Sequence, residues 1–436
     1  MNPLKILVFY GFPCSESHFL DIVVPNLKNS LSLSLKHFPS IAGKILIPNN
    51  NSRPVSRYVA GEDSVSMTIT VSNADFKKVT SYHSREVDEV YGLVTPHLPN
   101  SSTIKLLAFQ VTLFPNQGVC IGLTAHHSMC DGPALTLFMQ AWASINKFNG
   151  DESRLLESGE ECLPFYDRDV IADGDRLADE CWSHIKMFMP TNTTDTTTTS
   201  PLHSLVSTRE RTFHATFVLS EAEIQMLRSF VLNKNPGMVH VSSFTVACAH
   251  LWTCFLKSVA AAGEEVADDE PEYLSFAVDC RGRFNPPLPN NYFGNCMSAV
   301  VTESTNGKLR GNNGFLSASE AIGEAIRKNV DNDMGIMDSS MKSVLEFVKR
   351  MGERMLIVGG SPRLDFYGID YGWGKSVKYE TLLGDDNVKV VYFSNSRKYR
   401  GGIEIGVSMP KVRMDAFAAF FDRGIREVKE KLWCKM

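Results

Sequence analysis

A histidine and an aspartate four residues apart, His127 and Asp131, stand at the junction between two apolar segments. The segment 119–125 predicts a strand, and Pro133 suits the first position of a helix over 134–145. Because the pKa of an imidazole lies near neutrality, His127 could act as a general base. Asp131 is placed to cap the helix or to meet an arginine from elsewhere in the chain. On its own the H-x-x-x-D spacing is common by chance, and a turn histidine without chemistry is the simpler interpretation.

The segment Asp370-Tyr-Gly-Trp-Gly374 is also unusual, because two glycines flank a tryptophan. Glycine permits close backbone approach, so such a loop could line a channel or donate an N–H to an oxyanion. The alternative is an ordinary turn with a core tryptophan, in which Asp370 is a structural partner for a cation such as Arg281. A third segment, Asn291-Tyr-Phe-Gly-Asn-Cys296, has the composition of a rigid loop that enters a strand, without a defined chemical task.

His126, His127 and Cys130 have the composition of metal ligands. Adjacent histidines rarely converge on one ion, and the sequence has no second cluster of ligands. We therefore expect no metal site, and we expect Cys130 to be a small buried hydrophobic residue.

The elements that must position these residues fall into two halves of similar size. The polar run 190–201, rich in threonine, predicts a mobile linker between them. Each half mixes strand and helix patterns, which predicts two α/β domains with active-site loops at the ends of strands. Ser220 and Glu223 have the spacing of a capping box. The predicted strands are 6–12, 109–113, 119–125, 273–278 and 403–407, and the predicted helices are 22–37, 134–145, 220–232 and 243–256.

The composition is that of an ordinary soluble globular protein, with 43% hydrophobic and 21% charged residues among 436. A net charge of -5 gives no electrostatic reason to expect nucleic acid or an anionic membrane as a partner. No apolar stretch approaches the ~20 residues of a membrane span. The ten cysteines are scattered singly, which indicates reduced thiols and a cytoplasmic location.

Taken together and in this order, the motifs resemble those of the plant BAHD acyltransferase family. Its H-x-x-x-D motif corresponds to His127–Asp131, and its D-F-G-W-G motif to Asp370–Gly374, where Tyr371 replaces phenylalanine. The similarity extends over nearly the whole chain, including the segments 31–43, 164–168 and 361–370. Tyr292-Phe-Gly-Asn-Cys296 is similar to the mark of the clade that acylates anthocyanins and other phenolic glycosides, often with malonyl-CoA.

The resemblance implies an α/β fold like that of chloramphenicol acetyltransferase. Mixed β-sheets flanked by helices would form two domains with a solvent channel between them. The N-terminal domain would span 1–189 and the C-terminal domain 213–436, joined by a crossover linker at 190–212. Acyl-CoA would enter the channel from one side and the acceptor from the other.

The resemblance also implies roles for the motif residues. His127 would take the proton from the acceptor hydroxyl as this hydroxyl attacks the thioester carbonyl, without a covalent acyl-enzyme. Asp131 would orient the motif through an arginine, for which Arg281 is the candidate. Asp370 is a family-motif residue expected to support the channel together with Gly372 and Gly374, and Trp373 is a candidate for oxyanion support.

Substrate-binding residues are expected on two segments. A malonyl carboxylate needs a cation, and Arg168 is our candidate; a structural ion pair of Arg168 with Asp167 or another acid is the equal alternative. Four residues are candidates for the phosphates or pantetheine of CoA, with helix capping the equal alternative for the three hydroxyl residues: Ser242, Ser243, Thr245 and Lys234.

The leading functional hypothesis is transfer of malonyl from malonyl-CoA to a sugar hydroxyl of a flavonoid, anthocyanin or other phenolic glycoside. The alternatives are a hydroxycinnamoyl-CoA-dependent enzyme of the same clade, a peptide-synthetase condensation-type domain, and a catalytically impaired binding protein. The binding-protein alternative is included because family members usually begin with a further few dozen residues before the segment that corresponds to Phe9-Tyr10. We expect no permanently bound cofactor, acyl-CoA as co-substrate, small-molecule partners, no nucleic acid or membrane, and a monomer.

Overall fold

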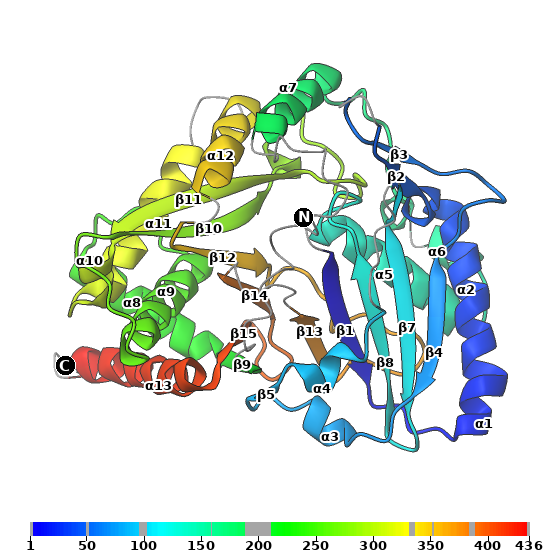
Figure 1. The fold of residues 1–436 in the computed structure, drawn as a ribbon, viewed down its shortest axis with the longest axis horizontal. Coiled ribbons are helices and arrows are strands. Elements are labelled where there is room, and N and C mark those ends of the chain that lie inside the picture. The colour runs from blue at the N-terminus through cyan, green and yellow to red at the C-terminus, as the bar shows by residue number, and fades with distance from the viewer. Residues whose placement is uncertain are drawn as a thin grey trace, which may run out of the picture.

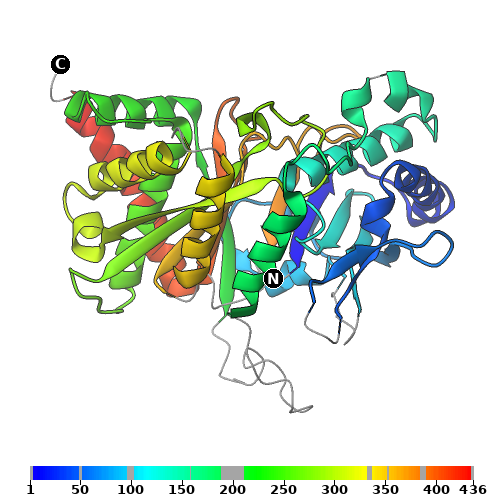
Figure 2. The same cartoon turned by 90° about the horizontal axis from the view of Figure 1, so that it is seen from above.

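The computed structural model describes residues 3–48, 52–95, 103–157, 159–187, 211–330, 336–350, 353–382 and 389–433. Two mixed α/β domains lie side by side, each built on its own sheet (Figures 1 and 2). The predicted linker 190–201 lies outside the described residues, as does most of 190–212.

The first domain contains a five-stranded sheet whose central strands are buried along their whole length. Strands β7 (Leu107–Phe114) and β8 (Gly118–Ala125) form its antiparallel hairpin. Helices α2 (Val24–His37) and α5 (Gly132–Lys147) cover one face of the sheet, and short helices cover part of the other. Because both faces are covered, β7 and β8 are mostly apolar, and their polar residues Gln110, Thr112 and Thr124 are buried and hydrogen-bonded.

Most of the remaining elements of this domain are short, and α7 (Gly174–Met187) is the longest of them. The sheet has the order β13-β1-β8-β7-β4, and a small three-stranded sheet has the order β3-β2-β6. A π-helical turn, Phe19–Val23, connects α1 to α2 and overlaps the start of the predicted helix 22–37. The strands are β1 Leu4–Tyr10, β2 Lys44–Leu46, β3 Val55–Arg57, β4 Ser66–Val71 and β6 Thr103–Lys105, and the helices are α1 Glu16–His18, α3 Phe76–Val79, α4 Asp88–Tyr91, α6 Ser153–Glu157 and α7 Gly174–Met187.

The second domain has a seven-stranded sheet of order β11-β10-β12-β14-β15-β9-β5. Strands β10, β12 and β14 run parallel, and the other neighbours are antiparallel. The strands are β5 Arg85–Glu86, β9 Thr212–Leu219, β10 Pro271–Asp279, β11 Met297–Thr305, β12 Met355–Gly360, β14 Lys389–Asn395 and β15 Ile403–Pro410. The helices are α8 Glu221–Lys234, α9 Ser243–Ala261, α10 Asn306–Arg310, α11 Gly314–Asn329, α12 Ile336–Arg350 and α13 Lys411–Trp433.

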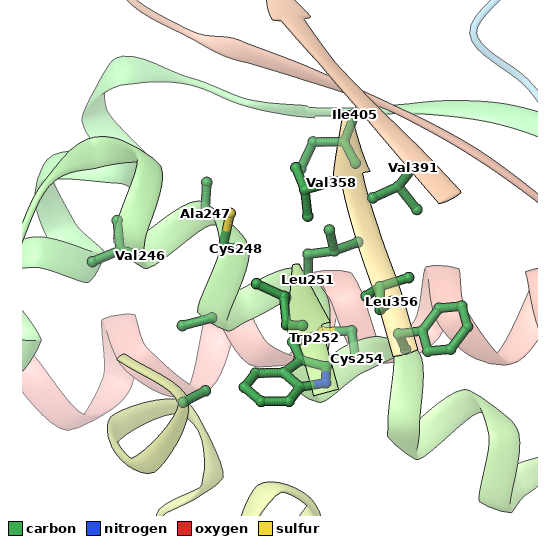
Figure 3. Packing of buried hydrophobic residues seen from close by; sticks show 14 of the residues in the cluster. Val246, Ala247, Cys248, Leu251, Trp252, Cys254, Leu356, Val358, Val391 and Ile405 are labelled. Atoms are coloured by element: carbon green, nitrogen blue, oxygen red, sulfur yellow. The ribbon is translucent and has the colours of Figure 1, made fainter. Parts of the chain in front are cut away.

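Helix α9 forms the centre of the second core. Leu251 and Trp252 are fully buried and pack near Leu356, Val358 and Val391 of the sheet (Figure 3). By length and apolar composition α9 could also cross a membrane, but 78% of its most apolar window is buried inside this domain. The helix therefore fulfils the prediction of a buried helix over 243–256 and continues five residues further.

The two domains exchange strands. Strand β13 (Lys378–Leu382) comes late in the chain but pairs with β1 in the first sheet, where it lies between the two domains (Figure 1). Strand β5 comes early in the chain but pairs with β9 in the second sheet. Each half of the chain therefore contributes a strand to the sheet of the other half.

A buried charged cluster lies where the exchanged strands meet. Arg85 of β5 pairs with Glu380 of β13, and the Glu380 carboxylate also faces Lys378 and His214, each 3.7 Å from Oε1. Lys378 donates to the hydroxyl of Thr216 at 2.7 Å. We call Arg85, His214, Lys378 and Glu380 the seam cluster; all four side chains are buried.

Candidate active site

The predicted strand, turn and helix around His127 are present. Strand β8 ends at Ala125 and α5 begins at Gly132, so His127 lies on the turn between them. Asp131 is the N-cap of α5, and its Oδ1 accepts a hydrogen bond from the Ala134 amide at 3.1 Å. The cap closes the turn against the first helical residues.

Asp131 meets Arg281 across the domain boundary. Oδ1 and Oδ2 of the carboxylate each lie 2.9 Å from a guanidinium nitrogen, and the two residues are 1% and 2% exposed. Oδ2 also accepts from the Cys296 amide at 2.9 Å. Since both carboxylate oxygens are engaged and buried, Asp131 supports the turn and is not placed to exchange a proton with substrate.

Arg281 stands directly after β10, on a short 3-10 turn. Its guanidinium also contacts Asp279, with Nη1 and Oδ1 3.0 Å apart. Burial disfavours the cation, but the hydrogen bonds and charges of Asp131 and Asp279 outweigh it and raise the pKa of Arg281. The guanidinium is therefore a permanent cation within the interface.

The two neighbouring histidines differ in their environment. Nδ1 of His126 lies 2.6 Å from the hydroxyl oxygen of Ser128, and the His126 amide donates to the Leu106 carbonyl. The imidazole of His127 is half-buried and has no hydrogen-bond or ion-pair partner among the residues that the structure describes. Only the carbonyl of His127 is held, by Nδ2 of Asn295 at 2.8 Å. The His127 ring is thus available to an incoming hydroxyl.

The His127 turn faces the carboxyl ends of the parallel strands of the second sheet. Strand β10 leads to Arg281, and β12 leads to Leu364, whose Cδ1 lies 2.7 Å from the place that a Cβ on Gly132 would occupy. A larger residue than glycine at position 132 would therefore displace Leu364. In open α/β sheets, ligands bind at the carboxyl ends of such strands.

The segment Asn291–Cys296, to which composition assigned no task, belongs to this site. The carbonyls of Tyr292 and Gly294 accept from Nη2 of Arg281 at 2.9 and 3.3 Å. The Cys296 amide binds Asp131 and the Asn295 amide group binds His127. Residue types alone could not predict these contacts, because the loop makes most of them through its backbone. The available signal was the similarity of Tyr292–Cys296 to the motif of one clade of the family.

Asp370 organises its own loop. Its Oδ1 accepts from the amides of Gly372 and Gly374 at 2.8 Å each, and Oδ2 accepts from Nζ of Lys147 at 2.8 Å. Burial raises the pKa of Asp370, but Lys147 and the two amides outweigh it and lower that pKa overall. Both glycines have positive φ, +93° and +84°, which other residues adopt only with strain. Asp370 is thus a structural partner for a cation, as the alternative interpretation held, but this cation is Lys147 and not Arg281.

The Asp370 loop lies far from His127. Lys147 is the last residue of α5, and Asp131 caps the first turn of this helix. The 16-residue helix therefore separates Asp131 from Lys147 by about 24 Å. Trp373 stacks on Phe12, with ring centroids 5.3 Å apart, and meets Tyr10 edge-on at 5.4 Å. The suggestion that Trp373 supports the oxyanion therefore does not fit, because its indole packs at the opposite end of the helix.

Arg168 contacts the Asn291–Cys296 loop. Its Nη2 donates to the Phe293 carbonyl at 2.5 Å, and its guanidinium lies 4.7 Å from the centre of the Tyr292 ring. Among the described residues Arg168 has no ion pair, and the Asp167 carboxylate instead accepts from the Asp169 amide. The alternative of a structural ion pair between Arg168 and Asp167 or another acid is therefore wrong within the described residues.

The hydroxyl residues proposed for CoA lie at the start of α9. Ser242 and Thr245 form a capping box: the Thr245 amide donates to Oγ of Ser242 at 3.1 Å, and the two hydroxyl oxygens are 2.8 Å apart. Ser243 is the first helical residue, and Lys234 is the exposed last residue of α8. Capping is thus the observed role of Ser242 and Thr245. In the described part of the chain, no group of three or more His, Cys, Asp or Glu side chains could hold a metal ion.

Curated relatives match nearly the whole chain. Phenolic glucoside malonyltransferase 1 of Nicotiana tabacum is 39% identical over 431 residues, 97% of this chain and 91% of that protein. The malonyl-coenzyme A:anthocyanin 3-O-glucoside-6''-O-malonyltransferase of Dahlia pinnata is 37% identical over 436 residues, 97% and 90% of the two chains. A coumaroyl-CoA:anthocyanidin 3-O-glucoside-6''-O-coumaroyltransferase of Arabidopsis thaliana is 33% identical over 434 residues, 97% and 90% of the two chains.

The fold is also that of known acyltransferases. The crystal structure of vinorine synthase aligns with a TM-score of 0.67 over 95% of this chain and 88% of that one, at 19% identity. The model of the Transferase family matches residues 1–423. With this match and relatives above 30% identity along nearly its full length, the chain belongs to the BAHD acyltransferase family.

Proposed function

We propose that this protein transfers malonyl from malonyl-CoA to a sugar hydroxyl of an anthocyanin or another phenolic glycoside. One structural observation carries the catalytic part. The imidazole of His127, which has no partner in the part of the chain that the structure describes, stands on a turn that the buried Asp131–Arg281 pair locks to the second domain. The base therefore lies at the boundary of the two domains. The substrate classes rest on the malonyltransferases among the relatives.

The proposed reaction uses the acceptor itself as nucleophile. An imidazole nitrogen of His127 takes the proton of the sugar hydroxyl while the oxygen bonds to the thioester carbonyl carbon. The resulting tetrahedral oxyanion collapses, the carbon–sulfur bond breaks, and the imidazolium returns its proton to the CoA thiolate. The products are the acylated glycoside, free CoA and the original imidazole, so no acyl-enzyme is needed.

Acyl-CoA is the proposed co-substrate, and no permanently bound cofactor enters the scheme. At the start of α9, Ser243 and the nearby Lys234 remain candidates for CoA contacts, because the amides of a helix N-terminus favour phosphate. Ser242 and Thr245 use their hydroxyls to cap the helix. We further propose a cytoplasmic location, since the nine described cysteines are free thiols. We also propose that the protein is a monomer.

Hydroxycinnamoyl transfer is the second candidate, which the 33% identical coumaroyltransferase favours. Purified protein would be given malonyl-, acetyl- and p-coumaroyl-CoA with a small set of flavonoid glucosides, and products would be identified by mass spectrometry. We expect the malonyl ester as the main product. A folded protein that releases no CoA from any donor would support the binding-protein alternative and defeat the enzymatic proposal.

His127→Ala tests the mechanism. Loss of a positioned general base costs about 10²–10⁴ in rate, so CoA release should nearly cease. His126→Ala is the matched control, because the neighbouring imidazole binds Ser128 and should affect the rate less than about tenfold. If His127→Ala retained full activity, the general-base assignment would be wrong.

A further inference from the structure

The orientation of the His127 ring has no visible support from another side chain. Catalytic bases are commonly oriented by a third group that hydrogen-bonds their second nitrogen. Here the nearest motif carboxylate, Asp131, is committed to Arg281. Within the described ranges, no donor or acceptor contacts the His127 imidazole. The main chain of the turn must therefore do the positioning.

One side chain holds that main chain from the other domain. Nδ2 of Asn295 donates to the His127 carbonyl at 2.8 Å, across 168 residues of sequence. Asn295 is itself exposed, so the hydrogen bond lies at the open side of the turn beside the half-buried His127. This contact fixes the peptide group that follows the base.

The neighbours of Asn295 are anchored on both sides. In the residue before Asn295, the Gly294 carbonyl accepts hydrogen bonds from Arg281 at 3.3 Å and from the Asp131 amide at 3.4 Å. On the side after it, the Cys296 amide donates to Asp131 at 2.9 Å. The backbone of Asn295 is thus held between two residues that bind the buried ion pair.

A second segment clamps the loop from outside. Arg168 donates to the Phe293 carbonyl and covers the Tyr292 ring. A Cβ on Gly294, whose φ is +152°, would lie 2.9 Å from Nη2 of Arg168. The backbone conformation therefore favours glycine there, and a larger residue would also displace the Arg168 guanidinium. The Phe293 amide also donates to the Phe165 carbonyl at 2.9 Å.

We propose that Asn295 is a positioning residue for His127: its amide holds the His127 peptide group so that the imidazole stays directed at the acceptor hydroxyl. This inference rests on the proposed role of His127 as the general base. Asn295 would act through the base and would not exchange a proton itself. Misplacement of a catalytic group by about 1 Å can cost about a hundredfold in rate.

Asn295→Ala and Asn295→Asp provide the test. Alanine removes the donor, and aspartate keeps the shape but turns an acceptor toward the His127 carbonyl. We expect kcat to fall about tenfold to a hundredfold in both, with KM for acyl-CoA and for the acceptor within about threefold of wild type, because binding surfaces are retained.

Asn329→Ala is the matched control. Its Nδ2 also donates to a backbone carbonyl at 2.8 Å, but to Ala325 within α11 and not to His127. Thermal unfolding should shift similarly in the position-329 and position-295 alanine variants, whereas only the latter should lose kcat. Equal loss of kcat in both variants, or a kcat within twofold of wild type for Asn295→Ala, would overturn the inference.

His127→Ala in the same assay separates the two proposals. If His127→Ala is inactive while Asn295→Ala is not impaired, the positioning role fails and the general base stands. If His127→Ala keeps full activity, both fail. If His127→Ala and Asn295→Ala both lose activity while Asn329→Ala stays active, both proposals are supported.

Discussion

Arg281 and Asp131 join the two domains through a buried two-point ion pair, with each carboxylate oxygen 2.9 Å from a guanidinium nitrogen. The pair does two things at once. It caps the helix that follows the His127 turn, and it fixes the Asn291–Cys296 loop through the Tyr292 and Gly294 carbonyls. The turn from the first domain and the loop from the second are therefore held by one contact.

Asp131→Ala should destabilise the fold far more than Asp279→Ala, although both carboxylates contact the same guanidinium. Removing one partner of a buried pair costs about 3–5 kcal/mol, because the other charge stays buried. The Asp279 side chain is 50% exposed, and exposed pairs contribute about 0–1 kcal/mol. Denaturant unfolding followed by circular dichroism measures the difference. Equal losses for the two variants would contradict the interpretation.

Trp373→Ala should reduce stability but spare catalysis by the folded protein. The indole packs on Phe12 and Tyr10 at the end of α5 remote from His127, so its removal costs up to about 3–5 kcal/mol. Loss of an oxyanion donor would instead lower kcat by about 10²–10³. Measurement of kcat at a temperature where the variant is fully folded distinguishes the two. A hundredfold loss of kcat there would restore the oxyanion role.

Local patterns predicted the elements of this site, and long-range contacts decided what they do. Each correct prediction used residues close in sequence to the element concerned. These are the apolar run of β8 before His127, Pro133 at the start of α5, and the Ser220–Glu223 capping box of α8. The partner of Asp370 could not be predicted in this way, because Lys147 is 223 residues away.

The seam cluster was missed for a related reason. Lys378 and Glu380 alternate with Tyr379 and Thr381 along β13, a pattern that ordinarily indicates a solvent-facing side of a strand. Strand exchange places that side between the two domains, where Lys378 and Glu380 are 0% and 3% exposed. Only the pairing of β13 with β1 reveals their burial.

Arg168→Ala should slow transfer from every acyl donor to a similar degree. The guanidinium holds Phe293 and Tyr292, so its loss would loosen the loop that carries Asn295 regardless of the acyl group. Arg168→Lys should not restore the rate, since lysine lacks the planar fork of donors. Rates with malonyl- and acetyl-CoA would be compared for both variants. A selective loss of malonyl transfer, partly restored by lysine, would instead establish Arg168 as the partner of the malonyl carboxylate.

Acidification should destabilise the protein before Glu380, the carboxylate of the seam cluster, is protonated. Burial lowers the pKa of His214 to about 4, although Glu380 opposes this, and Arg85 and Lys378 lower it further. Burial likewise lowers the pKa of His250 to about 4. Unfolded histidines bind protons below about pH 6.5. Between about pH 6.5 and 4 the unfolded chain therefore binds more protons than the folded one, and stability falls as the pH falls.

The pKa of Glu380 adds to this loss only in a more acidic range. Burial raises that pKa, but His214, Lys378 and Arg85 outweigh it and lower it overall, so its stabilising contribution is complete above about pH 4.5 and is lost below. Unfolding midpoints measured from pH 7.5 to 5 thus report the buried histidines. His214→Gln should flatten this dependence by about half because His250 remains, and His250→Gln should do the same because His214 remains. An unaltered pH dependence in His214→Gln would show that His214 is already protonated in the folded protein.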